Sequence, residues 1–164
     1  MSRLDFIKSK ILDGNELDYV LAQWRFKDYK IVFTNGCFDI LHRGHIEYLA
    51  KAASLGDVLI VGLNTDASVS RIKGLNRPVQ DEKSRALVLS SLGYISAVVL
   101  FDEDTPLKLI EQVQPDVLVK GADYKDEEIV GYDIVKSKGG EIVTIKLVKG
   151  YSTSSIMEKI SSLP

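Results

Sequence analysis

The chain has 164 residues, 45% hydrophobic and 27% charged, which is typical of one compact globular domain and not of a disordered segment. Its 21 Lys and Arg residues against 23 Asp and Glu give a net charge of −2, which argues against a protein that coats nucleic acid or an anionic membrane. No apolar stretch is long enough to cross a bilayer, the charged N-terminus is not a signal peptide, and a lone Cys37 excludes an intrachain disulfide framework. We therefore expect a cytoplasmic protein that binds neither nucleic acid nor membrane.

Residues 1–29 differ from the rest of the chain because their apolar side chains follow helical spacing without a strand-like run. Two stripes lie on either side of the turn-forming residues 13–15: Leu4, Ile7, Ile11 and Leu12, then Leu17, Val20, Leu21 and Trp24. We expect two lead-in helices over 1–29, followed by the main body over 30–164. Because the sequence has no internal repeat or low-complexity linker, a single domain is predicted overall.

From residue 30 onward, short β-branched runs alternate with longer segments of helical spacing. The predicted strands are Lys30–Thr34, Val58–Asn64, Ala97–Phe101, Asp116–Lys120 and Glu141–Leu147. Runs that are apolar almost throughout are typical of strands covered by helices on both faces. The alternation therefore predicts an α/β fold, with a five-stranded parallel sheet and helices on both of its faces.

Helices are predicted in the gaps between these strands. One has the apolar stripe Ile46, Leu49, Ala50 and Ala53 and ends before Gly56. Another begins at Thr105-Pro106, as an N-cap followed by proline at the first helical position, and a third ends at Gly139-Gly140. The segment from Asn64 to Asp81 is predicted to be a long loop, and long loops in compact domains are often functional.

Both histidines, His42 and His45, lie in the segment 34–45, between the first predicted strand and the first long helix. Such a turn lies at the carboxyl edge of a parallel sheet, where ligands bind, and the helix start offers N–H groups to a phosphate. Gly36 and Gly44 allow the backbone to approach a ligand closely. The two imidazoles can donate hydrogen bonds to phosphate oxygens, whose charge favours the protonated rings.

Other interpretations of this segment stay open. The His-x-x-His pair can ligate a metal with Asp39 or Cys37 as a third ligand, or it can be purely structural. The lack of further Cys or His and the presence of Gly44 favour phosphate over zinc. Cys37 is predicted to be a small core residue and not a nucleophile, because no third group is evident to orient an imidazole as its base.

Three further segments are candidates for binding an anion. A basic cluster, for which a solvated face is the simpler interpretation, contains Arg71, Lys73, Arg77, Lys83 and Arg85. Lys120 and Gly121 stand at the carboxyl end of a predicted strand, where a ligand site and an ordinary turn are equally consistent with the sequence. The run 152–155 has more hydroxyl groups than one helix cap needs, and it predicts phosphate binding at the start of the last helix.

Two segments together resemble a known superfamily. His42-Arg43-Gly44-His45 and Gly150-Tyr151-Ser152-Thr153-Ser154 are similar to the two phosphate motifs of the cytidylyltransferase-like nucleotidyltransferases, in the same order over about residues 30–160. Within this superfamily the segments 33–42, 64–68, 73–79 and 118–124 most resemble the D-glycero-β-D-manno-heptose 1-phosphate adenylyltransferases. The short lead-in, without a sugar-kinase domain, resembles their free-standing form. Glycerol-3-phosphate cytidylyltransferases have an arginine where this chain has Leu147, which disfavours that activity.

The resemblance implies a Rossmann-like sheet in strand order 3-2-1-4-5 and transfer of AMP from ATP to the heptose 1-phosphate, forming ADP-heptose and pyrophosphate. Mg²⁺ would bridge the triphosphate, with Asp39 as a candidate ligand or as a group that orients a histidine. A homodimer is a further expectation from the family. Two alternatives remain: a cytidylyltransferase for glycerol 3-phosphate or another polyol phosphate, and a nucleotide-binding module without turnover.

The resemblance also assigns roles by position. The implied catalytic residues are His42, His45 and Lys73. The implied contacts to nucleotide and phosphate are Thr34, Asn35, Gly36, Phe38, Gly44, Lys120, Gly121, Asp123, Ser152, Thr153 and Ser154. The implied contacts to substrate are Asn64, Asp66, Arg77 and Arg85.

Overall fold

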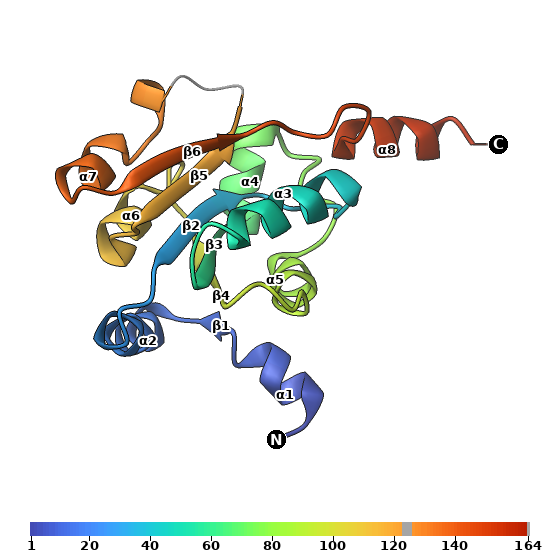
Figure 1. Cartoon of the computed structure of the whole chain (residues 1–164). Helices are drawn as coiled ribbons and strands as arrows, with labels where there is room; N and C mark the ends of the chain where they lie inside the picture. The colour runs from blue at the N-terminus through green and yellow to red at the C-terminus, as the bar shows by residue number, and fades with distance from the viewer. Residues whose placement is uncertain (123–125, 164) are drawn as a thin grey trace.

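The structure is a computed structural model that describes residues 1–122 and 126–163. Within these ranges the chain forms one sheet of six parallel strands, in the order β1-β4-β3-β2-β5-β6 (Figure 1). Their bounds are β1 Ile11–Leu12, β2 Ile31–Gly36, β3 Val58–Asn64, β4 Ala97–Phe101, β5 Val117–Gly121 and β6 Glu141–Ile145. The predicted α/β fold and the predicted order of the five long strands are confirmed.

The sheet has one strand more than the sequence predicted. Ile11 and Leu12 were assigned to a helical stripe, but they form β1 and pair with Val98 and Val99 of β4. A two-residue strand is too short to leave a period of its own in the sequence, so its partner strand determines its conformation. The lead-in thus contains two helices, as expected, but it also adds an edge strand to the sheet.

Helices cover both faces of this sheet. Their bounds are α1 Arg3–Lys8, α2 Gly14–Phe26, α3 Arg43–Ala53, α4 Asp66–Lys73, α5 Glu82–Ser90, α6 Leu107–Val113, α7 Tyr132–Ser137 and α8 Thr153–Ser161, with a short 3₁₀ turn η1 at Asp126–Glu128. One buried core lies between the sheet and α2, α6 and α7, and a second lies between the sheet and α3 and α5. Along β2, Phe33 enters the first core and Val32 the second, as the alternation of side chains along a strand requires.

Two predictions about connections were wrong. The predicted loop from Asn64 to Asp81 contains α4, which begins after Thr65, whose hydroxyl accepts a hydrogen bond from the backbone N–H of Ser68 at 3.2 Å. The connection that remains is therefore 74–81. Pro106 is the N-cap of α6 and not its first helical residue.

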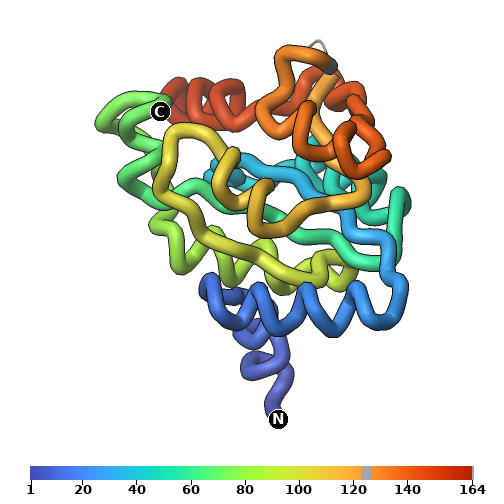
Figure 2. Tube along the Cα trace, turned by 90° about the vertical axis from the view of Figure 1, so that its left-hand side faces the viewer, coloured from blue at the N-terminus to red at the C-terminus, as the bar shows by residue number. Residues whose placement is uncertain are grey.

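The two ends of the chain lie at different ends of the molecule. Figure 2 shows α1 and α2 at one end and α8 near the other. In Figure 1, α8 extends beyond the carboxyl edge of the sheet, and none of its residues is buried. Across the described residues, no helix has the length and apolar character that a membrane span requires.

Candidate active site

Two adjoining hollows open at the carboxyl edge of the sheet. The smaller, of about 240 Å³, is lined by His42, Gly44, His45, Lys73, Arg77, Leu147, Val148, Tyr151, Ser152, Thr153 and Ser154. The larger, of about 460 Å³, is lined in part by the ends of β2, β3 and β5 and by the turn after β2, including Asn35, Gly36, Phe38, Asn64, Lys120 and Gly121. The residues that line both hollows are His45, Lys73, Arg77, Leu147 and Thr153. These shared side chains mark the junction between the two hollows.

The histidine pair lies at the start of α3, directly after the turn that follows β2. His42 is the N-cap in extended conformation, and its ring stacks on that of His45 with centroids 3.9 Å apart and planes 23° apart. Phe38 approaches His45 edge-on at 5.4 Å between centroids. In the described part of the chain, the Nδ1 atoms of both histidines are buried without a hydrogen-bond partner. The pair is therefore held by packing, with polar atoms left for another group.

Gly44 is required by the position of the His42 ring. A Cβ atom added at Gly44 would lie 3.0 Å from Cε1 and Nδ1 of His42, closer than ordinary van der Waals contact. A Cβ at Gly36 would likewise lie 2.9 Å from the Phe38 ring. The two glycines therefore allow an aromatic ring two residues away to fold back over the backbone.

Burial sets the charge of the histidine pair. It lowers the pKa of His42, and it lowers the pKa of His45 to about 4, with the charges of His42 and Lys73 adding to the effect. Both rings are therefore neutral near pH 7, and each keeps one N–H donor. An anion beside them raises these pKa values, because it favours the protonated ring.

The hydroxyl-rich segment at the start of α8 contacts the histidine turn directly. Ser152 is the N-cap and accepts a hydrogen bond from the backbone N–H of Ser155 at 3.0 Å. The hydroxyl of Thr153 donates to the carbonyl of Ile40 at 3.4 Å, and the Arg43 guanidinium lies 5.6 Å from the centre of the Tyr151 ring. The sequence segments around residues 42 and 152 thus form one surface, although more than a hundred residues separate them.

Lysines approach this surface from two other elements. Lys120, at the end of β5, donates a hydrogen bond to the side-chain oxygen of Asn35, and burial lowers its pKa to about 8. Lys73, the last residue of α4, is exposed and makes no ion pair within the described ranges. Asp123, which the sequence placed in this site, lies outside the described residues.

Arg85 corrects one prediction. The sequence assigned it to substrate, but it is only 1% exposed and its guanidinium is used inside the protein. It donates to the carbonyls of Gln80, Cys37 and Asn64 at 2.7 to 2.9 Å and pairs with Asp66 at 2.7 Å. Arg85 therefore links the ends of β2 and β3 to the 74–81 connection. The Asp66 carboxylate accepts a hydrogen bond from the same guanidinium and helps to hold it in place.

Thr34 and Asn64 are also engaged by neighbouring groups. The Thr34 side chain is fully buried, donates to the Val119 carbonyl at 3.0 Å and shares a hydrogen bond with the Tyr48 hydroxyl at 2.8 Å. It fastens β2 to β5 and α3, which corrects the expected contact with nucleotide. The Asn64 amide donates to the Ser68 hydroxyl at 3.0 Å while its residue still lines the larger hollow.

Asp39 does not take either role expected from the sequence. Its carboxylate accepts hydrogen bonds from the backbone N–H groups of Val79 and Gln80 and from Nε of Arg77, all at 2.8 to 3.0 Å. Among the described residues it has no hydrogen bond to either histidine, and both of its oxygens accept bonds from protein donors. Over residues 1–122 and 126–163, no group of three or more His, Cys, Asp or Glu side chains is placed to hold a metal ion.

Several residues that line the hollows were missed from the sequence, among them Leu147 and Tyr151. Leu147 lines both hollows, and Tyr151 lines the smaller one. Tyr151 stands inside the hydroxyl-rich motif, which was a usable signal. Leu147 was considered only as the position of an absent arginine, and its own contact was not predicted.

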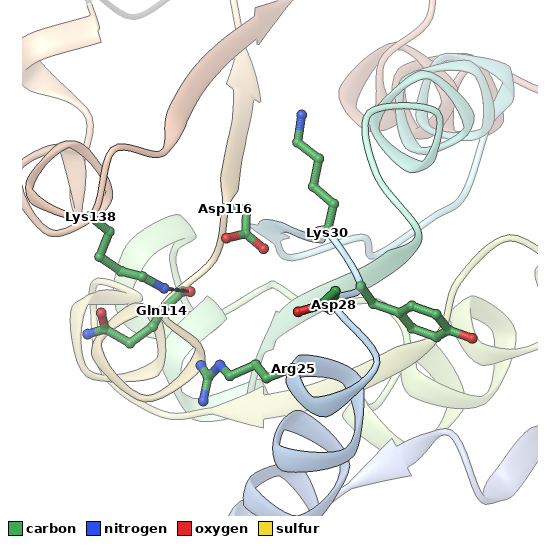
Figure 3. A pocket seen from close by; sticks show the side chains of 7 residues that line it. Arg25, Asp28, Lys30, Gln114, Asp116 and Lys138 are labelled. Atoms are coloured by element: carbon green, nitrogen blue, oxygen red, sulfur yellow. Dashed lines mark hydrogen bonds between the residues drawn. The ribbon is translucent and has the colours of Figure 1, made fainter.

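A third hollow, of about 510 Å³, lies at the amino ends of the strands (Figure 3). It is rich in charge, but Arg25 donates to the Val113 carbonyl at 2.6 Å and Lys138 to the Gln114 carbonyl. Both carbonyls belong to the C-terminal end of α6, where cations are favourable to the helix dipole. Asp116 accepts the backbone N–H of Ile31 at 2.8 Å. The hydrogen bonds of these three charged side chains therefore stabilise the fold and do not indicate a ligand.

A parallel sheet in this order, with paired imidazoles after β2 and a hydroxyl-rich helix start after β6, defines a protein of the α/β nucleotidyltransferase class. Residues 33–162 match the family model described as Cytidylyltransferase-like, and the chain belongs to that family.

The chain is similar to several known proteins. It is 54% identical over 154 residues to "Bifunctional protein HldE" of Citrifermentans bemidjiense, covering 94% of this chain and 32% of that protein. To the HldE of Campylobacter concisus it is 56% identical over 151 residues, covering 92% and 31%. The chain therefore spans about a third of the length of these curated relatives. The crystal structure of the lipopolysaccharide core biosynthesis protein of Thermoplasma volcanium superposes with a TM-score of 0.61 at 32% identity, covering 76% of this chain and 99% of that one.

Proposed function

We propose that the chain transfers AMP from ATP to D-glycero-β-D-manno-heptose 1-phosphate, giving ADP-heptose and pyrophosphate. The likeness to HldE over more than nine-tenths of the chain supports this choice within the family. The observation that carries it is the junction of the two hollows, where an imidazole, two cations and a hydroxyl meet. Such a junction suits a reacting phosphorus atom between a phosphate tail on one side and a nucleoside on the other.

In this proposal the triphosphate occupies the smaller hollow. Its oxygens accept hydrogen bonds from His42, His45 and the helix start at Ser152 to Ser154, where backbone N–H groups and hydroxyls converge. The nucleoside lies in the larger hollow, against Asn35, Gly36, Phe38, Lys120 and Gly121. The α-phosphorus then lies at the junction, beside His45 and Lys73.

The proposed reaction needs little acid–base catalysis. A phosphate monoester has a second pKa of about 6, so the sugar phosphate is mostly a dianion at neutral pH and attacks without a general base. One of its oxygens forms a bond to the α-phosphorus, the bond from that phosphorus to the bridging oxygen breaks, and pyrophosphate leaves with the electron pair. The protein must therefore position two anions and offset their repulsion, which is the role we assign to His42, His45 and Lys73.

Mg²⁺ fits this site as a companion of the nucleotide, not as a resident of a protein cage. When bound, it would neutralise charge on the triphosphate, with the nucleotide and water as its main ligands. Because the Asp39 oxygens are occupied by Arg77, Val79 and Gln80, we assign that residue no direct contact with the ion. Lys73 and the imidazoles supply the remaining positive charge and hydrogen-bond donors of the pocket.

The proposal includes a setting for the reaction. Its nucleotide donor is ATP, and we propose that the reaction takes place in the cytoplasm, where ATP is abundant. A homodimer remains an expectation from the family resemblance. Size-exclusion chromatography with light scattering, at several protein concentrations, measures the molar mass directly.

The decisive experiment is pyrophosphate release with Mg²⁺ from ATP, CTP, GTP and UTP in turn, each offered both anomers of the heptose 1-phosphate and glycerol 3-phosphate. Release with ATP and the β-anomer alone is the expected result. Release with CTP and glycerol 3-phosphate only would replace the proposal with a cytidylyltransferase. ATP binding without any release would instead indicate a nucleotide-binding module.

A further inference from the structure

The 74–81 connection, between α4 and α5, has little apolar packing to fix its position. Leu75 is 95% exposed and Val79 is 55% exposed, so neither anchors the connection to a core. Its contacts to the rest of the chain are instead polar. The Asp39 carboxylate binds the N–H groups of Val79 and Gln80, Arg85 binds the Gln80 carbonyl at 2.9 Å, and the Ser70 hydroxyl donates to the Arg77 carbonyl at 2.6 Å. Two buried charges therefore contribute to the position of this connection beside the site.

Asp39 is suited to this task by its own surroundings. Its side chain is 1% exposed and belongs to the same turn as His42 and His45. Burial acts to raise its pKa, but hydrogen bonds from Gln80, Val79 and Arg77 outweigh burial and lower it. The carboxylate thus stays ionised at neutral pH, and it links the histidine turn to a segment about 40 residues further along the chain.

The Asp39 carboxylate holds Arg77 through Nε and leaves its two Nη nitrogens without a bond to the described residues. Nε of Arg77 donates to Asp39 at 2.8 Å, and the side chain is 14% exposed. Within the described residues its two Nη atoms donate to no protein acceptor, while the residue lines both hollows beside Lys73 and His45. Arg71 differs, because its guanidinium is already paired with Asp104 and bonded to the Asp102 carbonyl.

We propose that Asp39 is a positioning residue that aims the two Nη nitrogens of Arg77 at the phosphate of the acceptor sugar. The inference rests on the proposed function and adds that Arg77 binds the phosphate of the acceptor sugar. A guanidinium fork binds phosphate oxygens in a bidentate manner, and the acceptor must bring a second dianion next to the α-phosphate. The triphosphate tail already has the imidazoles and the start of α8, whereas Arg77 stands at the junction, where the attacking phosphate arrives.

A double-mutant cycle tests the coupling. Arg77→Gln is expected to raise the KM for the sugar phosphate about tenfold or more, since a charge-assisted bidentate contact is lost, with the KM for ATP nearly unchanged. Asp39→Asn is expected to raise the same KM, and the double variant should be no worse than Arg77→Gln alone. The inference would be overturned if the two substitutions raised the KM for the sugar phosphate additively, or if they raised the KM values of both substrates equally. Arg77→Lys, which keeps the charge but loses the fork, should have an intermediate KM.

Asp116→Asn provides a matched control, because Asp116 also accepts a backbone N–H bond, from Ile31 at 2.8 Å, but at the other end of the strands. It should lower the Tm and leave both KM values unchanged. Hydrogen exchange of the Val79 and Gln80 amides provides a readout without turnover: Asp39→Asn should accelerate it, and Asp116→Asn should not. Unchanged exchange in Asp39→Asn would overturn the positioning role even in an active enzyme.

This design separates two kinds of failure. If the wild-type protein prefers another nucleotide and acceptor, the proposed function fails, and the same cycle run with that acceptor still decides the role of Arg77. If the wild-type protein transfers AMP to the heptose phosphate while Arg77→Gln keeps its acceptor KM, the proposed function stands and the inference fails.

Discussion

The two ends of the parallel strands both gather positive charge, but they use it differently. At the amino ends, Lys138 bonds to the Gln114 carbonyl (Figure 3), Arg25 bonds to the Val113 carbonyl, and Lys30 lies 3.5 Å from the Glu141 carboxylate. At the carboxyl ends, Lys73 has no ion pair in the described part of the chain, and both histidine Nδ1 atoms lack a partner. The difference lies in Lys73 and the histidines, because the described residues satisfy Arg85 at the carboxyl ends just as they satisfy Arg25 and Lys138 at the amino ends.

This contrast shows why the size and charge of a hollow do not identify a binding site. The hollow at the amino ends is larger than either of the two at the carboxyl edge, yet its polar groups stabilise the fold. A buried polar atom without a partner costs free energy, and a site that keeps such atoms has a use for them. Substitutions at the two ends should therefore separate activity from stability.

The largest expected effect is at His45. His45→Ala should lower kcat about 10²–10³-fold, because it removes a hydrogen-bond donor from the reacting phosphate, as removal of one such donor does elsewhere. Its Tm should stay near that of the wild type. Pyrophosphate release and a thermal melt followed by circular dichroism measure the two quantities. A folded His45→Ala protein with near-normal kcat would contradict the assigned mechanism.

Gly44→Ala should act on the same pair through geometry alone. Its Cβ would lie 3.0 Å from the His42 ring, which must shift by a few tenths of an ångström, so turnover should fall by less than the roughly 10²-fold that a misplacement of about 1 Å can cause. Gly93→Ala is the matched control, because a Cβ there meets no atom within 4 Å. Equal activity in the two variants would show that the position of His42 does not matter.

At the opposite end, Arg25→Ala should change stability and not activity. The substitution removes the hydrogen bond to the Val113 carbonyl, and because Arg25 is exposed and water can replace it, the cost should be about 0.5–1.5 kcal/mol. Urea unfolding measures the loss, and kcat and both KM values should equal those of the wild type. A change in kcat here would remove the distinction between the two ends.

The last effect is the pH dependence that His45 contributes. Its pKa of about 4 in the folded protein is below the value of about 6.5 for an unperturbed histidine, so the unfolded chain takes up a proton that the folded protein refuses. The free energy of unfolding should therefore fall as the pH is lowered from about 6.5 to about 4, by at most about 1.4 kcal/mol per pH unit from this group. Unfolding at pH 7.5, 6 and 5 should show a shallower decline in His45→Gln. An equal decline would assign the effect to other groups.

Local sequence patterns were sufficient to predict the frame of the molecule. β3 and β4 begin and end at the predicted residues, because an uninterrupted apolar run has clear limits. The histidine turn and the hydroxyl-rich start of α8 were both found from residue type and position after a strand. β1 was missed because Ile11 and Leu12 depend on β4, which lies far along the chain.

The prediction of the site was weaker wherever a polar side chain finds its partners at long range. Arg85 and Asp39 stand close to motif residues in the sequence and were assigned to ligands. In the structure their hydrogen bonds go to groups as distant as Asn64 and Gln80, and their roles follow from those contacts. The identity of a charged residue does not reveal whether other groups of the same protein already bind its hydrogen-bonding atoms.

The exposed helix α8 links folding to binding. An isolated helix of nine residues is shorter than the roughly 12–15 that are marginally stable in water, and α8 buries no residue that would compensate. Its first turn is also the segment assigned to the triphosphate. By mass action, an anion bound at that turn stabilises the helix, and the free energy of ordering the helix is subtracted from the affinity for the anion. In the proposed reaction, pyrophosphate would consequently be held less tightly than its hydrogen bonds alone allow, which favours its release.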